Sequence, residues 1–186
     1  MVYMVEVGLV NCKAAMETAE AAQWQEVVDS ECSSVARNKV LTLVDSVPTG
    51  KRAIPTRLIL QQKLGFGGEM LRYKARLIAQ GFRQVEGLDF TETFVPVARL
   101  SRVCIVLAIA GARGYAVHQM DVVIAFLESK QDEEIYVHLV LGVLGGPRIA
   151  WLNRSLYGLK QSPWYWYMTI DKFLVSQLGL DRKSVV

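Results

Sequence analysis

The sequence predicts an α+β fold, with an incomplete mixed or antiparallel sheet against which helices pack. Two extended segments, residues 53–63 and 70–80, flank a glycine-rich stretch, which is typical of a β-hairpin. Apolar residues at helical spacing recur near the start, in the middle and near the end of the chain. Strands and helices do not alternate in a strict β-α-β order, so a purely parallel α/β sheet is not expected.

Length and composition indicate one folded domain. The chain has 186 residues, of which 52% are hydrophobic and 21% charged, and this composition is not that of a disordered chain. No apolar run reaches the roughly 18 residues of a membrane span, and the apolar start contains Glu6 and lacks a signal-peptide pattern. Cys12, Cys32 and Cys104 are scattered, so we expect no disulfide partner, no zinc site, and an intracellular location, cytoplasmic or nuclear.

The first 37 residues form an acidic helical segment. Positions 1–36 hold six acidic residues and one basic residue. Small apolar side chains follow helical spacing around Trp24, which predicts one amphipathic helix over residues 13–36. A short β-prone run at 40–44 follows, and Pro48-Thr49-Gly50 then signals a turn.

The predicted hairpin carries most of the positive charge. Residues 51–84 contain eight basic residues and one acidic residue. Along the second strand Arg72, Lys74 and Arg76 point to one face, about 6–7 Å apart, a spacing that suits the oxygens of several phosphates. The alternative is an ordinary amphipathic strand with a solvated face, although like charges on one face repel each other. Charge alone does not decide between a polyanionic partner and this alternative.

The second half of the chain is expected to add a further set of elements. Gly111 and Gly114 are expected to end a buried helix, and Gly65-Phe66-Gly67-Gly68 to form the hairpin turn before it. In order, the elements are a loop at 81–99, the buried helix at 100–112, and strands at 115–123, 135–140 and 149–152.

A final helix is predicted from residue 162 onward. Ser162 is expected to be its N-cap, Pro163 to occupy the first turn and Gly179 to close it. Its apolar stripe is formed by Trp166, Tyr167, Ile170, Leu174 and Leu178.

Two further features are candidates for chemistry. Asp121 lies at the end of the apolar segment 115–123, where a carboxylate is costly unless a cation or a donor meets it. A magnesium ion shared with a phosphate is one solution, and a cap for a helix beginning near Ile124 is the other. In residues 155–163, Gly158 permits close backbone approach, and Lys160 precedes a helix N-terminus that favours anions. A plain strand-turn-helix connection explains that segment equally well.

Five strings occur in one order along the chain: RYKARLIAQGF at 72–82, EGLDFTETFVPVAR at 86–99, HQMDV at 118–122 followed by AFL at 125–127, EEIYV at 133–137 and SLYGLKQSP at 155–163. Together they resemble the reverse transcriptases of copia-type retrotransposons, and the resemblance runs from about Trp24 to the end. It implies an RNA-directed DNA polymerase, a nucleotidyltransferase of a Pol polyprotein, whose partners are an RNA template, a DNA primer and a deoxynucleoside triphosphate. It also implies a partial right-hand fold over residues 38–186, with fingers and the first part of a palm.

The resemblance assigns roles to individual positions. Asp121 corresponds to the first catalytic, metal-binding aspartate, with the Val122 backbone carbonyl as a second ligand of Mg²⁺. Phe126 corresponds to the residue that rejects a ribose 2′-hydroxyl. Lys74 and Arg76 correspond to the cations that hold the triphosphate. Tyr157 and Gly158 correspond to the residues that shape the nucleotide pocket. Arg72 and Lys160 correspond to residues that contact nucleic acid.

The same resemblance implies that the site is incomplete. Two divalent ions need several carboxylates, and in the family two come from a Tyr-x-Asp-Asp hairpin, whereas this chain contains no Asp-Asp pair. Val123 and Ile124 also stand where the family has a polar pair. We therefore expect a chain truncated before that hairpin and inactive by itself. The alternatives are a non-catalytic nucleic-acid-binding remnant that uses the basic strand, and a product that does not fold stably.

Overall fold

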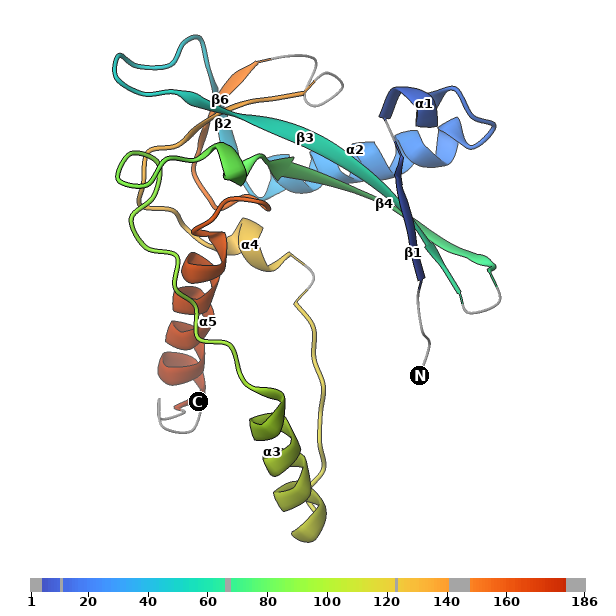
Figure 1. Ribbon diagram of the computed structural model, residues 1–186, viewed down its shortest axis with the longest axis vertical. Coiled ribbons are helices and arrows are strands. Elements are labelled where there is room, and N and C mark those ends of the chain that lie inside the picture. Colours follow the sequence, from blue (N-terminus) through green and yellow to red (C-terminus); the bar gives the residue numbers. More distant parts are fainter. Residues whose placement is uncertain (1–4, 11, 66–67, 123, 141–147, 180–186) are drawn as a thin grey trace.

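The computed structural model describes residues 5–10, 12–65, 68–122, 124–140 and 148–179, and it confirms the α+β class (Figure 1). Its six-stranded sheet has the order β1-β3-β5-β6-β2, with β4 paired to the other edge of β3. Only β3 and β5 are parallel among these pairs. The strands are β1 (Val5–Val10), β2 (Leu41–Val44), β3 (Ala53–Leu64), β4 (Met70–Ala79), β5 (Tyr136–His138) and β6 (Ile149–Leu152).

The predicted hairpin is confirmed as the antiparallel pair of β3 and β4. Leu58 lies opposite Leu77, and the buried residues alternate along both strands as a half-buried sheet requires. Two residues of the predicted turn, 66 and 67, lie outside the described residues. The predicted strands at 40–44, 135–140 and 149–152 correspond to β2, β5 and β6, of which β5 is shorter than expected.

The predicted helix at 13–36 is two helices, α1 (Cys12–Met16) and α2 (Ala21–Arg37). The Thr18 hydroxyl donates a hydrogen bond of 2.7 Å to the carbonyl oxygen of Ala15, and the amide of Ala21 donates to the carbonyl of Thr18. A threonine side chain that competes for backbone carbonyls in this way favours a turn over a continuous helix. The α2 helix packs on β4 through Trp24, whose ring meets that of Tyr73 edge to face at 4.6 Å between centroids.

The apolar core lies between α2 and the sheet and continues to the strands β5 and β6. Leu60, Leu77, Val137 and Leu152 are among its members that are almost fully inaccessible to solvent. This cluster includes residues from both ends of the chain, because β6 returns to pair with β2 in antiparallel register, Leu41 opposite Leu152.

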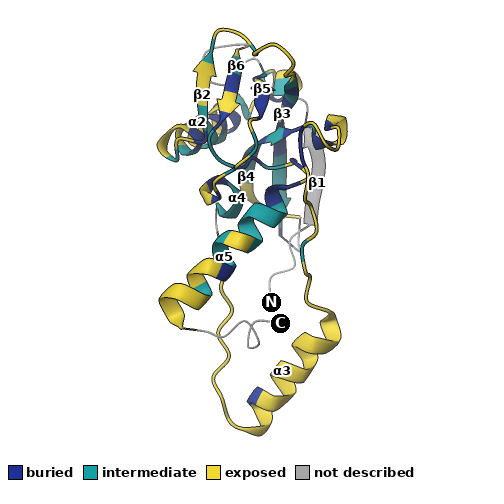
Figure 2. Cartoon of the chain, turned by 90° about the vertical axis from the view of Figure 1, so that its left-hand side faces the viewer, coloured by how far each residue is buried: buried dark blue, intermediate teal, exposed yellow. Residues whose placement is uncertain are grey.

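Helix α3 (Leu100–Ala112) has the predicted bounds, but the prediction that it is buried is wrong. Ala110 is its one buried residue, while Leu100 and Val106 are 77% and 64% exposed. Figures 1 and 2 show that α3 and the irregular segments on either side of it, which together we call the arm, lie apart from the sheet. A helix whose apolar residues surround it is normally buried, and here no described element packs against it closely.

The strand predicted at 115–123 is also wrong for residues 115–122, which run without regular structure to α4 (Ala125–Glu128). Residue 123 lies outside the described residues. A strand forms only where a neighbouring strand satisfies its amide and carbonyl groups, and no described strand lies beside this segment. Asp121 is therefore not at the end of a strand in this structure.

Helix α5 (Ser162–Leu178) is confirmed, with Pro163 in its first turn and Gly179 in the left-handed region at φ 65° after its end. The N-cap is Gln161 rather than Ser162, because the Ser162 hydroxyl instead donates to the carbonyl of Leu156 at 2.6 Å. Most of the predicted stripe is half-buried, but Leu178 is exposed. None of the helices in the described ranges is both long and apolar enough to cross a membrane.

Candidate functional site

A cavity of about 430 Å³ lies along the outer edge of β4. Residues 72–76 of β4 form one wall, and polar residues of α2 form another. Ile124, Leu127 and Tyr157 close it from segments far away in the sequence. The structure therefore places Arg72, Lys74 and Arg76 around the same cavity as Tyr157. The sequence alone did not indicate that these residues lie close together.

The cations of this wall influence one another. The pKa of Lys74 is lowered, first by burial and then by the positive charges of Arg76, Lys63 and Arg72, while Glu31 opposes the shift. An ammonium group in such surroundings is destabilised until an anion approaches it. The Arg76 guanidinium lies 5.7 Å from the centre of the Tyr157 ring, a distance typical of a cation–π contact.

Tyr157 and Gly158 are held against the end of β4. The amide of Ala79 donates to the carbonyl oxygen of Tyr157 at 2.7 Å, and Ile78 and Tyr157 form a parallel bridge. Gly158 has φ 87°, and a Cβ atom at this position would overlap the carbonyl oxygen of Ala79. The glycine is thus required both by its backbone conformation and by space.

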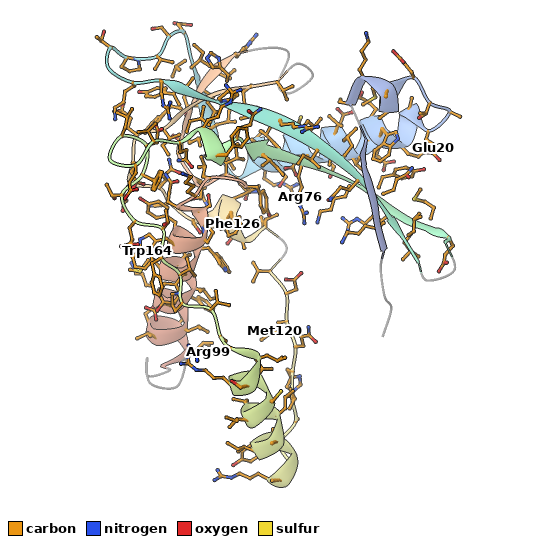
Figure 3. All side chains as sticks on the ribbon, viewed as in Figure 1. Glu20, Arg76, Arg99, Met120, Phe126 and Trp164 are labelled. Carbon is orange, nitrogen blue, oxygen red and sulfur yellow. The ribbon has the colours of Figure 1, made fainter. Side chains whose placement is uncertain are left out.

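Phe126 lies beside Tyr157, with 5.2 Å between the ring centroids. In Figure 3 it lies on α4 below the strand that carries Arg76, while Met120 lies on the extended segment between α3 and α4. Burial is the main reason why the pKa of Tyr157 is raised, with Arg76 opposing and the charges of Glu31 and Asp121 adding to it. Tyr157 therefore lines the cavity, while Phe126 and Gly158 lie next to it without lining the cavity themselves.

Asp121 is exposed on the arm, and it does not line the cavity. Within the described ranges, no group of three histidine, cysteine, aspartate or glutamate residues could hold a metal ion. Magnesium is usually held by one or two carboxylates together with phosphate oxygens and water. Asp121 fits one such ligand, but the described residues do not fit a site for two divalent ions.

Lys160 does not line the cavity. Its ammonium group lies 4.7 Å from the centre of the Phe90 ring, and its amide donates to the Oε1 atom of Gln84 at 2.8 Å. Gln84 Nε2 donates to Gln161 Oε1 at 2.9 Å, and Gln161 Nε2 to the Asp89 carbonyl at 3.0 Å. This buried amide network, which sequence reasoning missed, anchors the turn that presents Tyr157 and Gly158.

Glu31 is a further residue of the site that sequence reasoning missed. Its Oε1 atom accepts a hydrogen bond of 3.0 Å from the amide of Leu77. Burial raises the pKa of this carboxyl, while the Leu77 hydrogen bond, Arg76 and Lys74 act in the opposite direction. A signal was present in the sequence, because Glu31 lies three residues after Val28 and four before Val35, on the buried face of α2.

Residues 38–186 match the family described as Reverse transcriptase (RNA-dependent DNA polymerase), and the chain belongs to this family. No solved structure matches the chain significantly.

Several of the relatives are Pol polyproteins of transposons. The chain is 36% identical over 177 residues to the Retrovirus-related Pol polyprotein from transposon TNT 1-94 of Nicotiana tabacum, covering 94% of this chain and 13% of that protein. It is 32% identical to the corresponding protein from transposon RE2 of Arabidopsis thaliana, covering 88% and 12%. It is also 30% identical to the Truncated transposon Ty1-A Gag-Pol polyprotein of Saccharomyces cerevisiae, covering 59% and 9%. These relatives confirm the resemblance to copia-type elements, and the chain spans about an eighth of the length of the plant polyproteins.

Proposed function

We propose that the cavity beside β4 binds the triphosphate of an incoming deoxynucleotide in a retrotransposon reverse transcriptase. The observation that carries the proposal is that Lys74, Arg76 and Tyr157 line the same cavity. Tyr157 lies some 80 residues after the two cations in the sequence. Cations on one strand and aromatic rings opposite them are the two kinds of group that a nucleotide requires, for phosphate and for base or sugar.

The proposed roles follow from chemistry. Lys74 and Arg76 bind phosphate oxygens through charge-assisted hydrogen bonds, and an arriving anion offsets the burial and the repulsion that together lower the pKa of Lys74. The sugar packs against Tyr157, which lines the cavity, and Phe126, whose ring lies beside that of Tyr157, is the residue that rejects a 2′-hydroxyl. Gly158 lets the turn approach β4 closely enough for Tyr157 to reach the cavity.

We further propose that residues 38–186 are the fingers and the first part of the palm of a right-hand polymerase, and that residues 1–37 are a separate acidic helical segment. An RNA template and a DNA primer would be the nucleic-acid partners, with Arg72 and Lys160 as contacts to their phosphates. The exposure of both side chains supports this role.

A divalent ion, for which Mg²⁺ is the proposed species, would be held by the Asp121 carboxylate and the Val122 carbonyl. When bound, such an ion neutralises charge on phosphate oxygens and orients them. Because the described residues contain no group of three histidine, cysteine, aspartate or glutamate side chains that could hold a metal ion, we propose that residues 1–186 alone bind nucleotide but do not extend a primer. A primer-extension assay tests this directly, and extension that disappears in Asp121→Asn would contradict the proposal.

Binding of Mg–dTTP, measured by isothermal titration calorimetry, tests the nucleotide site. Lys74→Ala and Arg76→Ala should each weaken binding about tenfold, the scale of one charge-assisted hydrogen bond. Lys160→Ala is the matched control, because it removes the same charge from a side chain outside the cavity. Equal losses in all three variants would mean that only net charge matters, and the proposed site would be wrong.

A second candidate function is nucleic-acid binding without nucleotide binding. The basic face of the hairpin favours it, because the repulsion among Lys63, Arg72, Lys74 and Arg76 is relieved by any polyanion. A gel shift with an RNA–DNA duplex should then show binding that falls with salt, with a slope reduced by about one on replacing Arg72. Duplex binding in the absence of any Mg–dTTP binding would favour this candidate over the first.

A further inference from the structure

Helix α2 contributes one wall of the cavity, although it precedes residue 38, where the family match begins. Most of its contribution is polar, and Glu31 is the one carboxylate among the residues that line the cavity. A carboxylate among the cations that are proposed to bind phosphate would repel the ligand at short range. Its presence therefore calls for a role other than ligand contact.

The contact that Glu31 makes is to the backbone of β4. The amides of Leu77 and Ala79 both point to the outer edge of this strand, because amides alternate between the two edges. The Leu77 amide donates to Glu31 Oε1 at 3.0 Å, and the Ala79 amide donates to the Tyr157 carbonyl at 2.7 Å. Two consecutive outward amides at this end of β4 are thus held, one by a side chain of α2 and one by the backbone of the turn.

Glu31 does not pair directly with the cations. In the described part of the chain, no ion pair within 4.0 Å joins Glu31 to Lys74 or to Arg76. The influence of Glu31 on Arg76 and Lys74 is therefore exerted at longer range and through the strand. Arg76 directly precedes Leu77 in the chain, so the position of the Leu77 amide sets the position from which the guanidinium extends.

We propose that Glu31 is a positioning residue for the proposed nucleotide site: it fixes the outer edge of β4 at Leu77 and thereby holds Lys74 and Arg76 in place for a triphosphate. This inference rests on the proposed function. It assigns to the acidic helix α2 a part in nucleotide binding, by a hydrogen bond to the strand instead of a contact with the ligand.

The test compares Glu31→Ala, Glu31→Gln and Glu26→Gln in the chain of residues 1–186. Glutamine keeps a carbonyl oxygen that can accept from the Leu77 amide, whereas alanine removes it. Glu26 is exposed on the same helix and controls for the loss of one negative charge. We expect Glu31→Ala to weaken Mg–dTTP binding about tenfold, with Glu31→Gln and Glu26→Gln within about twofold of the original chain.

A second measurement separates positioning from a general loss of structure. Amide hydrogen exchange followed by NMR should become faster at Leu77 in Glu31→Ala, while Ala79, held by Tyr157, stays protected as an internal control. The salt dependence of Mg–dTTP binding should keep its slope in Glu31→Ala, because no phosphate contact is lost, whereas Lys74→Ala and Arg76→Ala should reduce it.

Three results would overturn the positioning role of Glu31, and one of them would also overturn the proposed nucleotide site. Unchanged binding in Glu31→Ala, with normal binding by the original chain, would overturn the positioning role and leave the proposed site intact. Tighter binding in Glu31→Gln would also overturn it, because the carboxylate would then act as a competitor of the phosphate. Absence of Mg–dTTP binding by the original chain would overturn the proposed function, and the positioning role with it.

Discussion

The hairpin of β3 and β4 and the arm that carries α3 contain similar apolar residues, but these residues lie in opposite environments. Leu60 and Leu77 of the hairpin are at most 1% exposed, whereas Leu100 and Val106 of α3 are 77% and 64% exposed. Figure 2 shows most of α3 in the colour of exposed residues. The difference is the presence of a partner, because α2 covers β4 while the arm stands apart from every described element. Apolar patterning therefore predicts which face an element could bury, and it does not predict what covers that face.

The largest expected difference between the two regions is in core stability. Leu60→Ala should cost about 2–5 kcal/mol, because it leaves a cavity in a fully packed site. For a chain of this size the melting temperature should fall by roughly 4–20 °C. Leu107→Ala in α3, where the side chain is 48% exposed, should stay within about 0.5 kcal/mol. Thermal melts followed by circular dichroism measure both, and equal losses would show that α3 is packed in solution.

The same substitution at two glycines gives the next largest effect. Gly158→Ala should cost about 2–4 kcal/mol, because φ is 87° and the new Cβ overlaps the Ala79 carbonyl. Gly111→Ala in α3 meets no atom within 4 Å, and it favours the helix by about 1 kcal/mol. The melting temperature should drop in the first variant only, and the far-ultraviolet helical signal should increase in the second. A neutral Gly158→Ala would mean that the turn does not pack on β4 as described.

A smaller effect should distinguish the charges of the two regions. Lys74→Gln should raise the melting temperature by about 1 °C at neutral pH, because burial and the neighbouring cations lower the pKa of Lys74 and make its charged form unfavourable. The gain should fade as the pH rises toward 10.5, where the lysine loses its charge in both states. Arg102→Gln on the exposed arm is the control. A destabilised Lys74→Gln would contradict this account.

The smallest effect concerns Glu31 and pH. Because the folded-state pKa of Glu31 is raised above 4.5, its contribution to stability is fully present below that pH and is lost as the pH rises through the folded value. Glu31→Gln removes this dependence, so its melting temperature relative to the original chain should increase from acidic to neutral pH. Melts at a series of pH values, with Glu26→Gln for comparison, measure the trend. The opposite slope would mean that the hydrogen bond and the cations outweigh burial.

Local patterns were sufficient for the elements that are stabilised by near neighbours in sequence. The hairpin, the bounds of α3 and the helix α5 could be predicted from alternation, helical spacing and glycine positions. The break before Ala21 could not, because it depends on where one threonine hydroxyl bonds. The strand expected at 115–122 failed for a related reason, since pairing needs a second strand, and alternation cannot supply one.

For the candidate site, the sequence indicated which residues could bind a nucleotide, and the structure shows which of them line one cavity. Arg72, Lys74 and Arg76 share a strand face by alternation alone, but their approach to Tyr157 depends on the end of β4 pairing with a distant turn. Glu31 could have been found from its spacing to Val28 and Val35, since a charge on a buried helix face needs a partner. Asp121 and Lys160 were predicted from motifs and lie outside the cavity.

The pairing of β2 with β6 has a consequence for synthesis on the ribosome. Val44 lies opposite Ile149, so more than a hundred residues must be translated before β2 meets its partner. At the usual rate of about 5–20 residues per second, this takes roughly 5–20 s. The hairpin and α2 can form early in that interval, while β2 keeps an open edge that can pair with strands of other nascent chains. Neighbouring ribosomes on one message would bring such edges close together, and β2 is then one segment at which nascent chains can pair wrongly.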